Sequence, residues 1–268
     1  MYFYLEYQSF CITITTKLFR FNKFFSQIKK HNIHLLALGL LLVGTALSSY
    51  SQNSEELVTS YKVFDKAIAL ENTGLSNGVE YLEQHIIRND QHKYFLSSDF
   101  MSGNLQYDGQ PYFDISLKYN IYDDILLVLL QNSGGVSNFE LHKENVDSFN
   151  IRNHAFIRVP SKESSEVQGF HEVLLNLPEV MLLKKHVKKI SKHLDRNFTY
   201  YEFENDDPQH VIYYRDSYFP INSRRDVQKI FPDHEKQIRI FYRSNRQLRK
   251  ENPDRFLSQL LQSLNSHL

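Results

Sequence analysis

Apolar and polar residues alternate with a period of two through most of the segment 79–221, a pattern typical of β-strands that bury one face. The clearest example is Pro111–Tyr119. In this segment Phe113, Ile115 and Leu117 recur at every second position, and polar residues stand between them. The alternation predicts that these three side chains share one buried face of a strand.

Turn signals and short links set the expected topology. Asp108-Gly109 precedes this strand and predicts a type I′ hairpin turn, because such a turn needs positive φ at both central positions. The unbroken apolar run Ile125–Leu130 predicts a strand covered on both faces. Further strands are expected at Phe139–His142, Val146–Ile151, His154–Val159, Phe170–Leu175, Val180–Leu183, Phe198–Phe203 and His210–Tyr214. Short links cannot hold parallel crossovers, so residues 52–222 are expected to form an antiparallel meander, either an open, curled sheet or a sandwich.

A short helix is expected at the start of this region, over Asn53–Leu70. Its apolar stripe would consist of Leu57, Tyr61, Phe64 and Ile68, which recur at steps of three and four. The fold class predicted is therefore mainly β with α.

The period returns to 3.6 after Pro220, and residues 223–268 are expected to form a helical tail packed on the β region. Ser223 with Asp226 three residues later resembles a capping box. Asn252-Pro253-Asp254 predicts a capped helix with proline at its first position. The apolar stripe of this last helix is Phe256, Leu257, Leu260, Leu261 and Leu264.

The N-terminal pattern is that of a secretory signal peptide over residues 28–51. Leu35–Leu47 carries no charge, Lys29-Lys30 precedes it, and small residues follow it, which predicts cleavage before Gln52. A membrane anchor is the alternative, but thirteen helical residues span only about 20 Å of a hydrocarbon core about 30 Å thick. The expected location is therefore secreted or periplasmic, with no membrane span after cleavage.

Residues 1–27 are unusual in front of such a signal, because signal peptides normally begin a few residues before the basic end. The segment shows no sustained period and reads as a spurious extension translated from upstream sequence. A genuine long basic region is the alternative.

Cleavage before Gln52 changes the charge and the cysteine content. It removes five of 31 Lys and Arg residues and one of 31 acids, which leaves 26 basic and 30 acidic side chains and a formal charge of −4. This balance argues against nucleic acid as a partner. Cys11, the single cysteine, is removed too, so the mature chain has no thiol chemistry or cysteine-ligated metal.

The candidate metal sites in the sequence are a pair of histidines and two acidic turns. His186 and His193 are seven residues apart within the lysine-rich run Lys184–His193, where no carboxylate completes a site and the lysines would repel a cation. We interpret this run as a solvated connecting helix, although clustered lysines could also contact acidic polysaccharide or lipid headgroups. The acidic turns at Asp123-Asp124 and Glu204–Asp207 are explained by turn chemistry rather than calcium binding. No metal or cofactor is expected.

The sequence contains no motif that identifies a catalytic residue. Gly134–Ser137 lacks the spacing of a nucleophile elbow, and no phosphate-binding glycine loop occurs. Asp114, Glu172 and Glu202 could supply the carboxylate pair of a glycoside hydrolase, but a chain with many acids always offers such pairs.

The candidate binding surface is aromatic. Tyrosines cluster towards the C-terminal hairpins, and exposed aromatic faces commonly bind sugars. Cross-strand packing within a sheet is the alternative explanation. The residues of this candidate surface are Tyr200, Tyr201, Tyr213, Tyr214 and Tyr218.

Several segments together resemble a family of uncharacterised secreted proteins of flavobacteria and related Bacteroidota. They are the signal ending in Ser-Gln, Asn77–Tyr81, Gly103–Tyr112 leading to Leu117–Asn120, Gly169–Leu174 and the tail from Ile230–Asp233 to Leu248. The resemblance implies secretion and a β-rich fold. It carries no catalytic motif, so it assigns no site residue.

Two classes of function remain. The first is a non-enzymatic binding or envelope-accessory protein whose partner is a glycan or an envelope protein, and it is favoured because no pre-formed catalytic motif is visible. The alternative is an extracytoplasmic hydrolase acting on glycan or peptide. A cleft that gathers two carboxylates, or a histidine with an acid, would favour the hydrolase. The sequence leaves the oligomeric state open.

Overall fold

A computed structural model describes residues 55–88, 90–132, 135–161 and 167–265. The chain divides into two units, residues 1–59 and 60–268, and the described part of the first unit is the beginning of a helix over residues 55–68. The expected extension (1–27) and signal peptide (28–51) lie outside the described residues. Among the residues described, no helix is both long enough and apolar enough to span a membrane.

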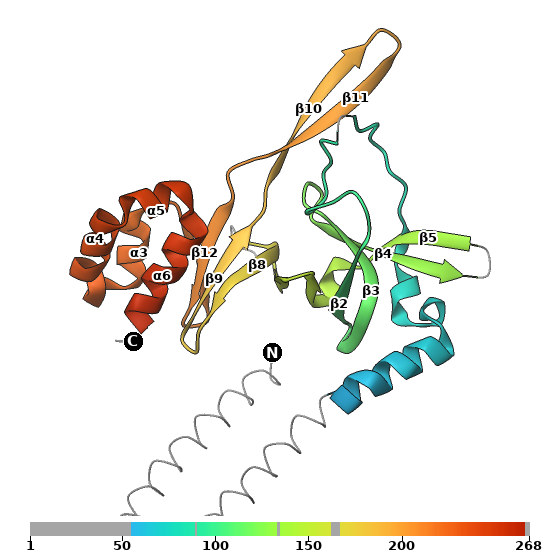
Figure 1. Cartoon of the computed structure of the whole chain (residues 1–268), viewed down its shortest axis with the longest axis horizontal. Helices are drawn as coiled ribbons and strands as arrows, with labels where there is room; N and C mark the ends of the chain where they lie inside the picture. Colours follow the sequence, from blue (N-terminus) through green and yellow to red (C-terminus); the bar gives the residue numbers. More distant parts are fainter. Residues whose placement is uncertain (1–54, 89, 133–134, 162–166, 266–268) are drawn as a thin grey trace, which may run out of the picture. The chain divides into compact units, whose positions relative to one another are not determined.

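The second unit is built on an open antiparallel sheet of eleven strands, in the order β1-β5-β4-β3-β2-β6-β7-β8-β9-β12-β13 (Figure 1). The two end strands, β1 and β13, do not pair, so the sheet is an antiparallel meander that does not close on itself. Its strands are β1 (Val79–Glu80), β2 (Met101–Tyr107), β3 (Gln110–Asn120), β4 (Ile125–Asn132), β5 (Gly135–Glu140), β6 (Val146–Ile151), β7 (His154–Val159), β8 (Gly169–Asn176), β9 (Val180–Lys185), β12 (Gln209–Tyr214) and β13 (Ser217–Ile221).

Two strands form a sheet of their own between β9 and β12 in the chain. β10 (Lys188–Asp195) and β11 (Phe198–Asn205) pair as a long antiparallel hairpin (Figure 1). The connecting helix expected over Lys184–His193 is therefore wrong. Within β10 the residues at every second position share a face, so the run has a strand period that its charges conceal.

The hairpin turn at Asp108-Gly109 is confirmed. Asp108 has φ 51° and Gly109 φ 74°, the positive angles of a type I′ turn, and Tyr107 pairs with Gln110 across it.

A β-bulge in β3 changes which side chains are buried. β3 contains one more residue than its partner β2 around Asp114, whose φ is 55°. The extra residue shifts the alternation by one, so Tyr112 is 2% exposed and Phe113 is only half-buried. Ile115 and Leu117 are buried as predicted, whereas the prediction for Phe113 is wrong.

The helices after the sheet are α3 (Arg224–Ile230), α4 (Glu235–Ser244), α5 (Arg246–Glu251) and α6 (Pro253–Asn265), and short 3₁₀ turns lie at Leu70–Asn72, Gly74–Asn77, Lys143–Asn145 and Pro232–His234. The predicted helix starts are present. Asp226 accepts hydrogen bonds from the backbone and hydroxyl groups of Ser223, and Asn252 Oδ1 accepts one from the backbone of Arg255.

Two large apolar cores hold the second unit together, with a smaller apolar cluster of Val159, Val167, Leu183 and Val211. The first lies along β2–β8 and is rich in aromatic rings, with Phe149 and Phe156 stacked at 4.7 Å between centroids. The second joins β9 and β12 to the C-terminal helices. Its members include Val180, Leu182, Ile212, Val227, Ile238, Phe256, Leu260 and Leu264.

The helix over 55–68 buries a different face from the one expected. Leu57 is 57% exposed and Phe64 is 54% exposed, whereas Asp65 is buried. The apolar stripe predicted from spacing is therefore wrong for Leu57 and Phe64, because the helical period alone does not say which side of a helix is buried.

Candidate functional site

A pocket of about 640 Å³ lies where the turn between β3 and β4, the 3₁₀ turn at Lys143–Asn145, β7, β8 and β9 approach the start of β10. Four of the residues that line it, Lys143, Arg158, Lys185 and Lys188, are lysine or arginine. Asp124 and Glu144 supply its two carboxylates. The wall therefore has a formal charge of +2, and we call it the basic pocket.

Asp124 is the central acceptor of the basic pocket. Its carboxylate lies 2.6 Å from Lys185 Nζ and 2.5 Å from Lys143 Nζ. It also accepts a hydrogen bond from the hydroxyl group of Tyr119 at 2.8 Å and from the backbone N–H of Phe170 at 3.3 Å. With four donors around it, Asp124 fixes both lysines in place.

Gly169 permits this arrangement. Its φ is +84°, and a Cβ atom at this position would lie 1.9 Å from Asp124 Oδ2 and 2.8 Å from Lys185 Nζ. A larger residue would therefore collide with the ion pair and would also strain the backbone.

Two cations of the basic pocket are not paired with a carboxylate in the part of the chain that the structure describes. Arg158 donates through Nε to the carbonyl oxygen of Val146 at 2.8 Å. Lys188 donates to the carbonyl oxygen of His92 at 2.7 Å. Burial lowers the pKa of Lys188, because a desolvated ammonium group loses favourable hydration. A carbonyl oxygen does not neutralise the charge of either side chain, so an anion placed beside Arg158 or Lys188 would be attracted to it.

His171 lines the basic pocket as a neutral imidazole. It is 2% exposed, and Nδ1 donates to the carbonyl oxygen of Gly169 at 3.1 Å. Burial lowers the pKa of His171 to about 4, so the ring adds no charge at neutral pH.

Glu172 bridges two histidines at one side of the basic pocket. Oε1 lies 2.5 Å from His154 Nδ1, and Oε2 lies 2.6 Å from Nε2 of the pocket residue His186. Burial alone would raise the pKa of Glu172, but the hydrogen bonds from His186 and His154 lower it below its usual value. Glu172 therefore stays ionised and holds both rings.

The ring of Phe95 packs edge-on against both histidines of this bridge. Its centroid lies 5.0 Å from that of His154 and 5.0 Å from that of His186. The bridge consequently links β7, β8 and the residue after β9 around an aromatic side chain. We therefore expect these contacts to hold this side of the basic pocket rigid.

The five tyrosines predicted as a binding surface lie on three strands in two sheets. Tyr200 and Tyr201 belong to β11, Tyr213 and Tyr214 to β12, and Tyr218 to β13. The structure pairs Tyr213 with Tyr218, whose ring centroids are 4.8 Å apart. The set is therefore not gathered by one sheet.

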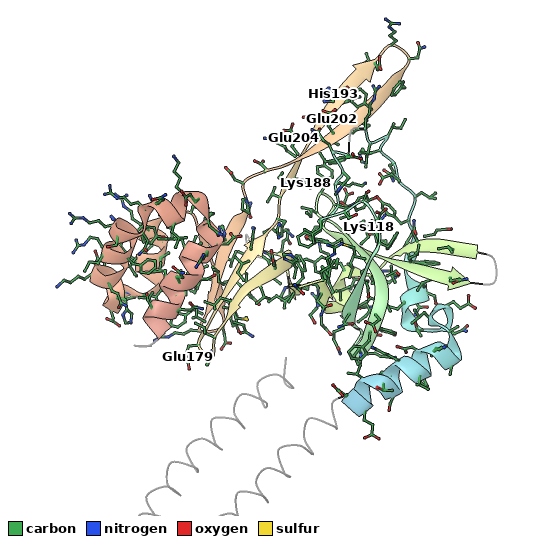
Figure 2. All side chains as sticks on the ribbon, viewed as in Figure 1. Lys118, Glu179, Lys188, His193, Glu202 and Glu204 are labelled. Carbon is green, nitrogen blue, oxygen red and sulfur yellow. The ribbon has the colours of Figure 1, made fainter. Side chains whose placement is uncertain are left out.

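Each of these tyrosines has a neighbour of its own. Tyr200 stacks on His193 at 4.9 Å, Tyr201 meets His85 edge-on at 4.8 Å, and Tyr214 packs on Phe231 at 5.0 Å. Figure 2 shows His193 on the β10–β11 hairpin beside Glu202. His193 Nε2 lies 3.1 Å from the Glu202 carboxylate, but the approach is outside hydrogen-bond geometry.

The carboxylates considered for glycoside hydrolysis each have a different basic partner. Asp114 pairs with Lys62 at the surface, Glu202 lies beside His193, and Glu172 lies between its two histidines. The described residues contain no group of three or more His, Cys, Asp or Glu side chains placed to hold a metal ion.

Sequence reasoning missed the residues of the basic pocket. In the sequence, turn chemistry is enough to explain Asp124, and the lysine-rich run that contains Lys185, His186 and Lys188 resembles a solvated helix. The signal that was missed is the period of two over residues 188–195, which indicates a strand. With that strand assigned, His186 lies in the link between β9 and β10.

Comparisons with protein-family models, with curated proteins and with solved structures find no match. The geometry of the chain therefore carries the functional argument alone.

Proposed function

We propose that this chain is a secreted or periplasmic binding protein, without catalytic activity, that takes an anionic group of its ligand into the basic pocket. The observation that carries the proposal is the charge of the pocket wall, where four Lys and Arg side chains outnumber two carboxylates. A concave site with a few fixed polar groups is the usual form of a small-molecule site.

The cations that meet the ligand are expected to be Arg158 and Lys188. Lys143 and Lys185 are held on Asp124, whereas Arg158 and Lys188 donate to backbone carbonyl groups, which carry no full charge. A carboxylate or phosphate group provides the charged acceptor that both side chains lack. A uronic acid within a glycan and a phosphorylated ligand share this chemistry.

Isothermal titration calorimetry tests the proposal with galacturonate and inorganic phosphate as anionic probes and galactose as the neutral control. We expect an anionic probe to bind and galactose not to bind. The double variant Arg158→Gln/Lys188→Gln should weaken binding at least about ten-fold, because a charge-assisted hydrogen bond contributes about 1.5–3 kcal/mol.

Lys189→Gln is the matched control, since Lys189 is exposed on β10 and does not line the pocket. The melting temperature of the double variant separates loss of binding from loss of fold. Binding that is unchanged in a folded double variant, or equal binding of galactose, would contradict the proposal. The preference between galacturonate and phosphate distinguishes the two ligand sources.

A hydrolase is the second candidate, and the Glu172–His186 hydrogen bond favours it. A carboxylate that orients an imidazole beside a pocket is the usual support of a general base. The binding proposal is preferred because Glu172 also holds His154, as expected of a bridge that connects strands. Screening with glycosidase, esterase, phosphatase and peptidase substrates tests the alternative. Turnover that His186→Gln abolishes would establish the hydrolase.

A further inference from the structure

Positive charge is concentrated in the C-terminal helices. Residues 223–268 carry ten Lys and Arg side chains and five acids, whereas residues 1–222 carry the other 21 basic and 26 acidic side chains. All ten basic side chains of the helices are exposed. A chain with no formal net charge therefore presents one strongly basic part.

Some acids of these helices are already engaged. Asp226 accepts hydrogen bonds from Ser223, and Asp254 lies 2.6 Å from both His210 Nε2 and Lys184 Nζ. Within the part of the chain that the structure describes, none of the ten basic side chains of the helices forms a salt bridge. Their charge is therefore available to an external partner.

The basic side chains follow the outer face of α4 and continue onto α5. Lys236, Arg239 and Arg243 recur at steps of three and four on α4, so they lie on one side of the helix, opposite the buried Ile238. Arg246, Arg249 and Lys250 extend the exposed charge along α5. Figure 2 shows long nitrogen-tipped side chains on the outside of these helices. We call these six residues the basic helix face.

An apolar side chain lies within the basic helix face. Ile240 is 55% exposed, and it stands one residue after Arg239 and three residues before Arg243. Lys and Arg side chains around an exposed aliphatic residue are typical of helices that lie in the plane of a lipid surface, where charge meets headgroups and the apolar group meets the acyl boundary.

We propose that the basic helix face docks on an anionic lipid surface. Charge complementarity favours an anionic partner, since the six cations contact no acid in the described structure. Ile240 favours lipid over nucleic acid or a soluble polysaccharide, because a strongly hydrated polyanion gains nothing from an exposed isoleucine. The proposal does not depend on the basic pocket, which lies on other elements.

Vesicle co-sedimentation of the purified chain tests this docking. We expect binding to mixed phosphatidylcholine–phosphatidylglycerol vesicles and little binding to phosphatidylcholine alone. Binding should weaken as salt is raised, because charges beyond about 8 Å are screened at physiological ionic strength. Lys236→Gln/Arg239→Gln/Arg243→Gln should reduce the bound fraction at least about ten-fold, since each basic residue near an anionic surface contributes roughly a five-fold effect.

The matched control is Lys189→Gln/Lys192→Gln/Arg196→Gln, which removes three exposed cations from the β10–β11 hairpin. Docking predicts that this control binds as the wild type does. Ile240→Ser should weaken vesicle binding and leave binding to heparin unchanged. The proposal is overturned if no vesicle binding occurs, if both triple variants lose binding equally, or if Ile240→Ser has no effect on vesicles. Circular dichroism establishes that each variant is folded.

Discussion

Lys93 Nζ lies 2.9 Å from Glu83 Oε1, although only 1% of the lysine side chain is exposed. A second carboxylate, Asp123, lies 3.3 Å from the same ammonium group. Burial would lower the pKa of Lys93, but Tyr81 and Glu83 raise it above its usual value. Through Asp123, Lys93 thus fixes the segment before β2 against the turn that precedes β4.

The first prediction concerns this buried ion pair. Lys93→Met should lower the free energy of unfolding by about 3 kcal/mol, because it leaves two partly buried carboxylates without their cation. Lys62→Met is the control, since Lys62 pairs with Asp114 at the surface and should cost no more than about 1 kcal/mol. Urea denaturation measures both. Equal effects of the two substitutions would contradict the buried role of Lys93.

The second prediction concerns the contact between α6 and the sheet. Leu260 is 0% exposed in the core that contains Val180 and Ile212. Leu260→Ala should therefore cost about 2–5 kcal/mol, through lost burial and the cavity it leaves. Ile240→Ala, at a position 55% exposed, should change stability by less than about 0.5 kcal/mol. Thermal unfolding followed by circular dichroism gives the comparison, and a Leu260→Ala protein with wild-type stability would refute the packing.

The third prediction is a pH dependence from His171. Its pKa is about 4 in the folded state because of burial, and about 6.5 when unfolded. Between these values the unfolded chain binds the extra proton, so stability is full above about pH 6.5 and falls as the pH drops towards 4. The loss from this group approaches about 3 kcal/mol.

Substitution of His171 isolates its share of this pH dependence. His171→Gln should flatten the stability profile between pH 6.5 and 4, because it removes the group whose pKa is lowered by folding. The measurement is the free energy of unfolding in urea at a series of pH values. A His171→Gln protein with the full wild-type slope would show that another group titrates.

The fourth prediction concerns Gly169. Gly169→Ala should open the Asp124–Lys185 pair, since the new Cβ would lie 1.9 Å from Asp124 Oδ2. We expect lower stability and loss of galacturonate binding. Gly109→Ala is the matched control, because Gly109 has a φ of +74° but no atom within 4 Å of its Cβ position. Gly109→Ala should lower the free energy of unfolding by about 1–3 kcal/mol through backbone strain alone, and this variant should still bind galacturonate. Calorimetry that finds binding intact in Gly169→Ala would contradict the role of this glycine.

The open antiparallel sheet could be predicted because its signals are local. Asp108-Gly109 determines a turn type by itself, and several strand limits follow directly from alternation, as at Val146–Ile151 and His154–Val159. The helix starts at Ser223 and Asn252 are equally local, since each cap contacts a residue three positions away.

Other features depend on contacts between distant residues. The bulge at Asp114 cannot be read from β3 alone, because it is defined by the count of residues on β2. The lysines of β10 resemble a solvated helix until their pairing with β11 is known.

The basic pocket is a further case of this kind. Asp124, Lys143 and Lys185 are separated by 19 and 42 residues along the chain, and sheet pairing brings them together. In the sequence, each of these residues is explained by its nearest neighbours alone. The positive charge of the basic pocket could therefore not be predicted without the topology of the sheet.

The place where an anionic ligand binds is the most direct test of the proposed binding role. A titration of isotopically labelled protein with galacturonate, followed by amide NMR, gives that location. We predict shifts at Gly169, Lys185 and Lys188 in the basic pocket, with no change at Tyr200 or Tyr218. Shifts at those two tyrosines without change at Gly169, or no shift at saturating galacturonate and phosphate, would contradict it.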